Sequence, residues 1–133
     1  MIVVDTNILS YFFLDSLYSD KAVGLFKQEP VWNAPYLWKN EFRNVLSLYL
    51  RKGLITIDAA FFTMDKAELL MEGYEFYITS RHILTLVNES KCSAYDCEFV
   101  ALAQQLNIKL VTEDKKIIYE FPEIAVNIDT YLS

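Results

Sequence analysis

The sequence predicts an α/β fold in which helices cover both faces of a mainly parallel sheet. Short apolar segments alternate with longer helical patterns along the whole chain, which is typical of parallel βα units. The first segment, MIVV at residues 1–4, is apolar throughout, as expected of a strand buried on both faces. The chain has only 3 glycines and 3 prolines, which argues against an all-β fold with many tight turns.

The predicted elements follow one another in a regular order. Thr6 and Asn7 are cap residues for a short helix over ILSYFFL, residues 8–14. Gly53 and Gly73 end two long helices, because glycine readily adopts the left-handed conformation that closes a helix. The further helices are expected over residues 21–28, 36–52, 57–72, 80–90 and 93–107, with a short one after residue 112. The further strands are expected over residues 31–35 (a strand or an extended link), 74–78, 108–112 and 125–128.

Composition and charge narrow the functional class. A chain of 133 residues with 53% hydrophobic residues predicts one domain over 1–133 with a sizeable core, and excludes a disordered tail. The 12 basic and 18 acidic residues give a net charge of −6, so a nucleic-acid partner would need a local device that overcomes repulsion. Cys92 and Cys97 indicate reduced thiols in a cytoplasmic protein. No apolar run is long enough to span a membrane, and we expect no signal peptide.

Three consecutive aromatic residues, Tyr11, Phe12 and Phe13, spread over more than half of a helix circumference. Either part of this surface meets a partner, or the helix is sandwiched between core layers. Together with Phe61 and Phe62, these residues are candidate contacts for another protein.

Two carboxylates are expected where predicted strands end. Asp5 follows the first strand, and Asp114 lies just beyond the strand that contains Ile108 to Val111. Ligands of open parallel sheets bind outside the carboxyl ends of the strands, so the two acids would meet if these strands are neighbours. The alternative is that each acid only caps the helix that follows it.

Glu41 lies within the apolar stripe of its predicted helix. Leu37, Val45 and Leu48 fall within about 40° of it on a helical wheel, whereas Lys39 and Arg43 point away. A lone ionised carboxylate in that position costs several kcal/mol unless it is paired or binds a metal. A buried salt bridge or a protonated glutamic acid would also explain it.

Asp96 repeats this pattern on a later helix. Val100 and Ala103 lie within about 40° of it, whereas Glu98 falls on the opposite face and reads as a solvated acid. The alternative is a capping box, because Ser93 precedes Asp96 by three residues.

The four acids together predict a cation site. They can converge only if something cancels their repulsion, and the single histidine, His82, lies in an apolar run that favours a structural role. Ligands that are all oxygen suit Mg²⁺ or Mn²⁺ rather than zinc. Such an ion activates water and attracts phosphate to an acidic protein.

The sequence resembles the PIN-domain ribonucleases, particularly the VapC-type toxins of prokaryotic toxin–antitoxin pairs. The resemblance covers essentially the whole chain and rests on four motifs, MIVVDTNILSYFF, LWKNEFRNVL, SAYDCEFVALAQQLN and KLVTEDKKI. It implies a three-layer α/β/α sandwich around a parallel sheet of about five strands. It places the four metal-site acids of the family on Asp5, Glu41, Asp96 and Asp114, with Glu113 adjacent to the last. It places the supporting polar groups on Thr6, Asn7 and Thr112.

The resemblance also implies an activity and partners. These are Mg²⁺- or Mn²⁺-dependent hydrolysis of single-stranded RNA to a 5′-phosphate and a 3′-hydroxyl, a homodimer, and an antitoxin that blocks the groove. Basic residues near the predicted acids could contact phosphate, although they could equally be solvated surface charges; they are Lys39, Arg43, Lys115 and Lys116.

Two other functional classes remain open from the sequence. In a catalytically silent binding module the acids would be caps or relics, and the protein would neither bind Mn²⁺ at the four acids nor cleave RNA. A receiver-like phosphoacceptor domain needs paired acids after the first strand, and the Thr6 and Asn7 that follow Asp5 argue against it.

Overall fold

A computed structural model describes residues 1–133, and at its centre is a five-stranded, wholly parallel sheet. Its strands are β1 (Ile2–Val4), β2 (Trp32–Pro35), β3 (Glu75–Phe76), β4 (Leu110–Val111) and β5 (Ala125–Val126). Every strand pair is parallel, in the order β3-β2-β1-β4-β5. The predicted fold class is therefore confirmed, and residues 32–35 form a strand rather than a link.

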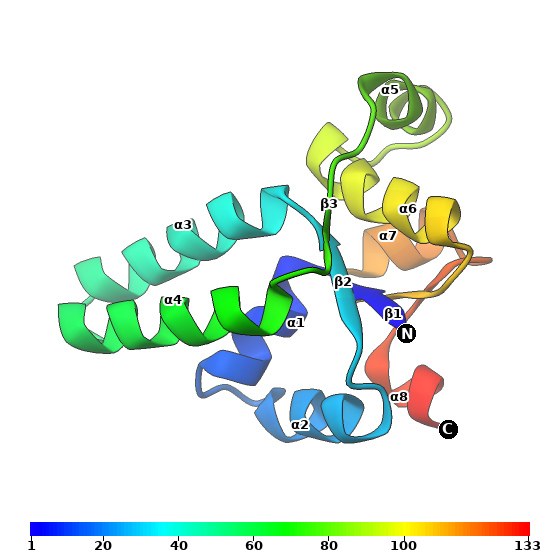
Figure 1. The fold of residues 1–133 in the computed structure, drawn as a ribbon. Helices are drawn as coiled ribbons and strands as arrows, with labels where there is room; N and C mark the ends of the chain where they lie inside the picture. Colours follow the sequence, from blue (N-terminus) through cyan, green and yellow to red (C-terminus); the bar gives the residue numbers. More distant parts are fainter.

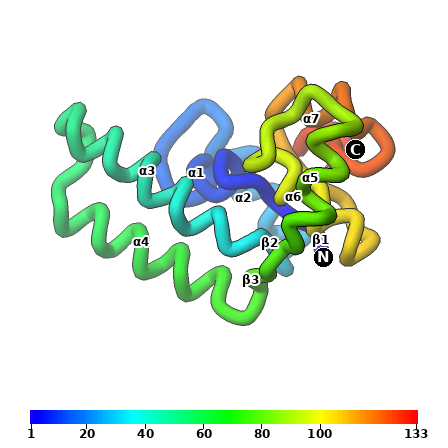
Figure 2. The backbone as a smooth tube through the Cα atoms, turned by 90° about the horizontal axis from the view of Figure 1, so that it is seen from above, coloured from blue at the N-terminus to red at the C-terminus, as the bar shows by residue number.

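Helices cover both faces of this sheet, which makes the three layers of the sandwich. They are α1 (Thr6–Phe13), α2 (Ser19–Gln28), α3 (Leu37–Arg51), α4 (Ile57–Met71), α5 (Ser80–Asn88), α6 (Ala94–Leu106), α7 (Lys115–Glu120) and α8 (Ile128–Leu132). Figure 1 shows α1 to α4 on one side of the sheet and α5 to α7 on the other. Seen from above in Figure 2, α3 and α4 run side by side and project beyond the strands as a helical hairpin. No helix is both long and apolar enough to cross a lipid bilayer.

The strand order places a crevice beside β1. The first three strands follow one another in the sheet, with β2 beside β1 and β3 at the edge. The last two strands, β4 and β5, lie on the other side of β1. The order therefore reverses between β1 and β4, where Val4 lies opposite Val111. Such a switch point is where ligands bind in open α/β sheets, just outside the carboxyl ends of the strands. The residues that follow Val4 and Val111 are thus brought to this crevice by topology alone.

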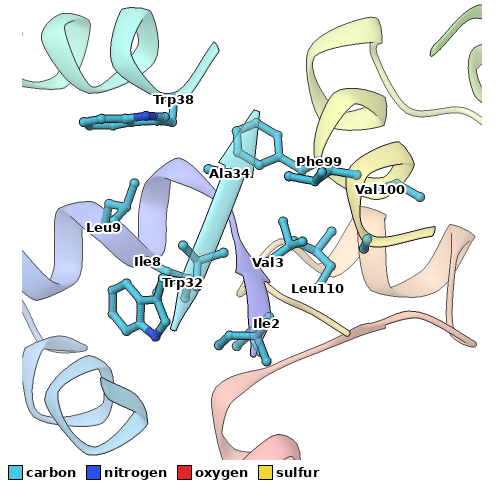
Figure 3. Packing of buried hydrophobic residues seen from close by; sticks show 14 of the residues in the cluster. Ile2, Val3, Ile8, Leu9, Trp32, Ala34, Trp38, Phe99, Val100 and Leu110 are labelled. Carbon is cyan, nitrogen blue, oxygen red and sulfur yellow. The ribbon is translucent and has the colours of Figure 1, made fainter. Parts of the chain in front are cut away.

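The sheet is held by one hydrophobic cluster of 29 buried residues. All three residues of β1 are completely buried, as the apolar opening of the sequence predicts. Figure 3 shows Leu9 and Trp38 on one side of β1 and β2, and Phe99 and Val100 on the other. Because both faces of the central strand are covered, any polar residue at its end is also drawn out of solvent.

Helix ends agree with most of the predicted boundaries, but α1 begins at Thr6 with Asp5 as its N-cap, so the prediction that Thr6 and Asn7 are cap residues is wrong. Gly53 and Gly73 have φ values of +69° and +85° and follow α3 and α4, as expected. The strands β3, β4 and β5 are each shorter than predicted, with two residues apiece. The last of them ends early because Asn127 accepts a hydrogen bond from the Thr130 amide and starts α8 at Ile128. A five-residue helix has too short a pattern to be recognised in the sequence.

Tyr11, Phe12 and Phe13 follow the second of the two interpretations drawn from the sequence, a helix sandwiched between core layers, rather than an exposed contact surface. All three are partly buried and pack against the core, so α1 is a helix sandwiched between layers. The Phe12 ring lies 4.9 Å from that of Phe26 and 5.1 Å from that of Trp32, measured between centroids. Phe61 and Phe62 of α4 are exposed, as predicted.

We predict that Phe12→Ala lowers the free energy of unfolding by about 2–3 kcal/mol, because it removes a ring from this aromatic cluster. Phe62→Ala is the matched control, since the Phe62 ring is 66% exposed and should change stability by less than about 0.5 kcal/mol. Urea denaturation of both variants measures the difference. Equal effects would contradict the packing described for α1.

Candidate active site

A pocket of about 540 Å³ opens at the carboxyl edge of the sheet, beside β1 and β4. Its 13 lining residues include the four acids singled out in the sequence. The lining consists of Asp5, Thr6, Asn7, Leu37, Asn40, Glu41, Asn44, Val45, Tyr95, Asp96, Phe99, Asp114 and Ile117. The fold therefore brings Asp5, Glu41, Asp96 and Asp114 from four separate segments to one cavity.

Asp5 is the most buried of these acids, with 7% of its surface exposed. Its Oδ1 accepts a hydrogen bond from the Ile8 amide at 3.2 Å, and its Oδ2 accepts one from the Thr112 hydroxyl. Burial raises the pKa of Asp5 to about 7, and nearby Asp114 and Glu41 add to this rise, while the two hydrogen bonds oppose it. Thr112 itself is completely buried, so it acts from behind the pocket as a support for Asp5.

Glu41 faces the pocket from α3, where its Oε1 accepts a hydrogen bond from the Thr6 hydroxyl at 2.6 Å. The buried face of α3 is centred on Trp38, Phe42 and Leu46. Glu41 therefore lies beside the apolar stripe rather than in its middle, and the exposed Leu48 does not belong to the stripe at all. Burial raises the pKa of Glu41, and Asp96 raises it further. The sequence prediction was wrong about the centre of the stripe, yet it correctly marked Glu41 as a half-buried acid.

Asp96 and Asp114 enter the pocket from the first turn of α6 and from the start of α7. The Asp96 amide donates to Ser93 Oγ at 3.1 Å, which caps α6 as the alternative interpretation proposed. Burial and the charge of Asp114 raise the pKa of Asp96, whereas Ser93 and Lys116 lower it. Asp114 caps α7, because its Oδ1 accepts from the Lys116 and Ile117 amides at 2.9 and 3.2 Å.

Capping the helices uses only part of the hydrogen-bonding capacity of these carboxylates. Asp5 and Asp114 both cap the helix that follows them, which was the alternative drawn from the sequence. Each cap uses only one carboxylate oxygen. The Thr112 hydroxyl donates to Asp5 and also accepts from the Asp114 amide at 3.0 Å, which ties the two residues together across the switch point. Both residues line the pocket, and Asp114 Oδ2 accepts no hydrogen bond from the protein.

The four acids form a cluster that no salt bridge neutralises, although the charge of Lys116 acts on Asp96. Asp114 and Glu41 raise the pKa of Asp5, Asp96 raises that of Glu41, and Asp114 raises that of Asp96. No salt bridge reaches any of them, because the four ion pairs of the protein use Glu29, Asp129, Glu68 and Glu75. Such repulsion between carboxylates is relieved either when some of them take up a proton or when a cation binds between them.

Three other charged residues, Lys39, Glu113 and Glu98, have surroundings that the sequence did not indicate. Lys39 is held 3.5 Å from Glu68 and 3.9 Å from Glu75, so it is turned to acids outside the pocket. Glu113 Oε2 accepts from the Ile128 amide at 2.9 Å and thereby supports α8. The interpretation of Glu98 as a solvated acid was wrong, because burial and the nearby Glu41 raise its pKa.

His82 Nε2 lies 2.9 Å from Gln104 Oε1, in line with the structural role expected for it. Asn40, Asn44 and Tyr95 line the pocket but were not singled out from the sequence. The available signal was position, since Tyr95 directly precedes Asp96, and the two asparagines lie one residue before and three residues after Glu41.

The donor set fits a hard divalent cation in its chemistry. The four carboxylates, with Thr6 and Asn7, offer only oxygen ligands apart from the asparagine amide nitrogen. Mg²⁺ and Mn²⁺ prefer such oxygens and usually retain several water ligands. No group of three or more His, Cys, Asp or Glu side chains is placed so that it could hold a metal ion together, so an ion here would depend on water or substrate oxygens for the rest of its ligands.

The chain matches the PIN domain family model over residues 2–125. It belongs to the PIN-domain family. Among curated proteins, no relative matches the sequence. PIN domains are in general metal-dependent nucleases, which agrees with an acidic pocket at the switch point of this sheet.

Solved structures share the fold at low sequence identity. The crystal structure of PAE2754 from Pyrobaculum aerophilum is 20% identical, with a TM-score of 0.77 over 98% of this chain and 85% of that one. FitAcB from Neisseria gonorrhoeae is 15% identical, with a TM-score of 0.71 over 96% and 98%. A toxin–antitoxin complex from Klebsiella pneumoniae is 16% identical, with a TM-score of 0.71 over 96% and 98%.

We predict that Asp5→Asn stabilises the metal-free PIN domain at pH 8 by on the order of 2 kcal/mol and changes little at pH 4. The pKa of Asp5 is about 7 in the folded protein against an ordinary value of 3.8, so the folded state holds this proton more tightly. The free energy of unfolding of the wild type should therefore fall as the pH rises from about 4 to about 7, and the variant should lack this part of the fall.

Denaturation in EDTA across this pH range measures the effect, with the exposed Asp65→Asn as the matched control. A variant that is less stable than the wild type at pH 8 would show that Asp5 is a favourable capping charge rather than a strained one.

Proposed function

We propose that this PIN domain is a metal-dependent endoribonuclease that hydrolyses single-stranded RNA and serves as the toxin of a type II toxin–antitoxin system. The observation that supports it most is the convergence of four carboxylates, none of them in a salt bridge, in one pocket at the switch point. The resemblance of the fold to a toxin–antitoxin complex and to FitAB bound to a DNA fragment, with a TM-score of 0.73, adds support for the toxin role.

Asp5, Glu41, Asp96 and Asp114 would hold one or two Mg²⁺ or Mn²⁺ ions. A bound ion of this kind supplies a water nucleophile at neutral pH and stabilises charge on the phosphodiester. The side chains around the acids keep them in place, since Thr6 fixes Glu41, and Thr112 and the Ile8 amide fix Asp5. With its pKa near 7, Asp5 is fully ionised only above neutral pH, so cation binding should strengthen as the pH rises to about 8.

The products expected from water attack are a 5′-phosphate and a 3′-hydroxyl. No side-chain nucleophile is needed for this reaction. Cys97 supports that view, because burial raises the pKa of its thiol and keeps it in the unreactive form.

The antitoxin would cover the apolar surface of α4. Phe61, Phe62 and Leu69 expose between 60% and 73% of their surface on this helix, which projects with α3 away from the sheet. Exposed aromatic rings of this size are frequent anchors of protein interfaces. Self-association into a homodimer and a cytoplasmic location complete the proposal, and light scattering at micromolar concentration tests the first of them.

We predict that the wild-type protein cleaves unstructured RNA in the presence of Mg²⁺ or Mn²⁺ and that EDTA abolishes this cleavage. Asp5→Asn should lower kcat/KM for cleavage at least about 100-fold. Gel analysis of a 5′-labelled oligonucleotide measures the cleavage and the chemistry of the ends. The exposed Asp65→Asn should retain full activity. Full activity of Asp5→Asn would refute the assignment of the acids, and inactivity of the wild type with every cation would favour the silent binding module.

We predict that the double variant Phe61→Ser, Phe62→Ser loses at least about tenfold in its inhibition by the cognate antitoxin while it cleaves RNA normally, because two apolar anchors are removed. The probe is the antitoxin that the proposal expects, a small DNA-binding protein sought in the gene directly upstream, added in increasing amounts to the cleavage assay. Tyr119→Ser is the control, since Tyr119 is exposed on α7 rather than on α4. Unchanged inhibition would place the antitoxin on another surface.

A further inference from the structure

The pocket has no positive charge of its own for RNA. Its 13 lining residues include no lysine, arginine or histidine. Lys39 pairs with Glu68 and Glu75, and Arg43 donates to Asn40 Oδ1 at 3.2 Å and to the Lys39 carbonyl at 3.3 Å. A bound cation neutralises charge at the scissile phosphate, but the neighbouring nucleotides need a different source of affinity. Lys116 acts on Asp96 but does not line the pocket, so within the lining that source is uncharged.

Tyr95 is the most prominent uncharged group at the pocket. Its side chain lines the cavity, yet 63% of its surface remains exposed. Its ring belongs to none of the aromatic pairs of the protein, and its hydroxyl makes no hydrogen bond to another side chain or to the backbone. Tyr95 is also the residue immediately before Asp96, so it lies directly beside the acid cluster. Neither packing in the core nor helix capping explains why the Tyr95 ring is exposed at this pocket.

Three exposed asparagines extend the uncharged lining. Asn7 comes from α1, and Asn40 and Asn44 come from successive turns of α3 on either side of Glu41. No protein group accepts a hydrogen bond from the side-chain NH₂ of any of them. Amide donors hold sugar and phosphate oxygens without adding charge, so they complement a stacking ring.

We propose that Tyr95 stacks on an unpaired nucleobase next to the scissile phosphate and that it selects single-stranded over duplex RNA. This inference rests on the proposed ribonuclease function and names how its site recognises RNA. Stacking on an aromatic ring needs a base with a free face, which single strands offer and duplexes do not. The pocket, at about 540 Å³, lies within the range of sites that take small ligands, so it has room for a nucleotide unit.

The test is steady-state cleavage of a short oligouridylate with Mg²⁺ by the full chain and its variants. Tyr95→Ala should raise KM roughly five- to fiftyfold, the loss expected for one stacked base, and leave kcat within about twofold. Tyr95→Phe should restore the wild-type KM, because the phenyl ring stacks without the hydroxyl. Tyr119→Ala removes a ring that is still more exposed, at 82%, and does not line the pocket, and it should behave as wild type.

A second measurement shows whether the ring meets a base. Fluorescence anisotropy with Ca²⁺ compares the binding of the intact oligonucleotide with that of versions lacking one base at each position. At one position the loss of the base should weaken wild-type binding to the level of Tyr95→Ala and leave Tyr95→Ala itself unaffected. The ratio of single-strand to duplex cleavage should fall in Tyr95→Ala by the same factor as KM rises.

The outcomes separate this inference from the function on which it rests. A wild type that cleaves RNA while Tyr95→Ala keeps its KM overturns the stacking role alone. A Tyr95→Phe variant as weak as Tyr95→Ala shows that the hydroxyl, not the ring, is used, and it also overturns the role. A wild type that neither binds nor cleaves RNA overturns the ribonuclease function and the stacking role together.

Discussion

The burial of one carboxylate at the end of the central strand determines the rest of the site. All three residues of β1 must be apolar because both faces of the strand are covered, and this places Asp5 at the edge of the core. There it loses solvent, and only the Ile8 amide and the Thr112 hydroxyl replace the water. Two hydrogen bonds do not fully compensate an ionised carboxylate, so its pKa rises to about 7. A protein that keeps such a residue carries a local strain that a cation would relieve.

The same side chains serve the fold and the site. Asp5 and Asp114 begin α1 and α7 as N-caps, and Thr112 joins them. The Asp114 cap uses only Oδ1, whereas Asp5 uses Oδ1 for the cap and Oδ2 for the bond from Thr112, so both carboxylates are held in fixed directions. The interpretation of these acids as caps and their interpretation as cation ligands are therefore compatible. In physical terms, capping orients the carboxylates before any ion arrives, which reduces the entropy cost of binding it.

Local sequence patterns were sufficient to predict those features of the fold and site that depend on residues adjacent along the chain. The apolar opening segment identified β1, and Gly53 and Gly73 marked the ends of α3 and α4. The parallel order then brought Asp5 and Asp114 to one edge without knowledge of any side-chain contact. Glu41 and Asp96 were found as acids on partly apolar helix faces, although the wheel misplaced the centre of α3.

Features that depend on distant segments could not be read from the sequence. The aromatic residues of α1 looked exposed because Phe26 and Trp32, which cover Phe12, come from α2 and β2. Glu98 was misjudged because the carboxylate that raises its pKa, Glu41, belongs to another helix. Tyr95 was overlooked for the same reason, since its position at the pocket depends on how α6 packs across the sheet.

The most direct test of the site is anomalous diffraction from a crystal of the wild-type protein soaked in MnCl₂ at pH 8. The convergence of four carboxylates that form no salt bridge predicts an anomalous peak between Asp5, Glu41, Asp96 and Asp114 that is absent from crystals of the Asp5→Asn variant. No peak in that pocket at a manganese concentration that occupies other sites, or an equal peak in the variant, would contradict the assignment of these acids as a cation site.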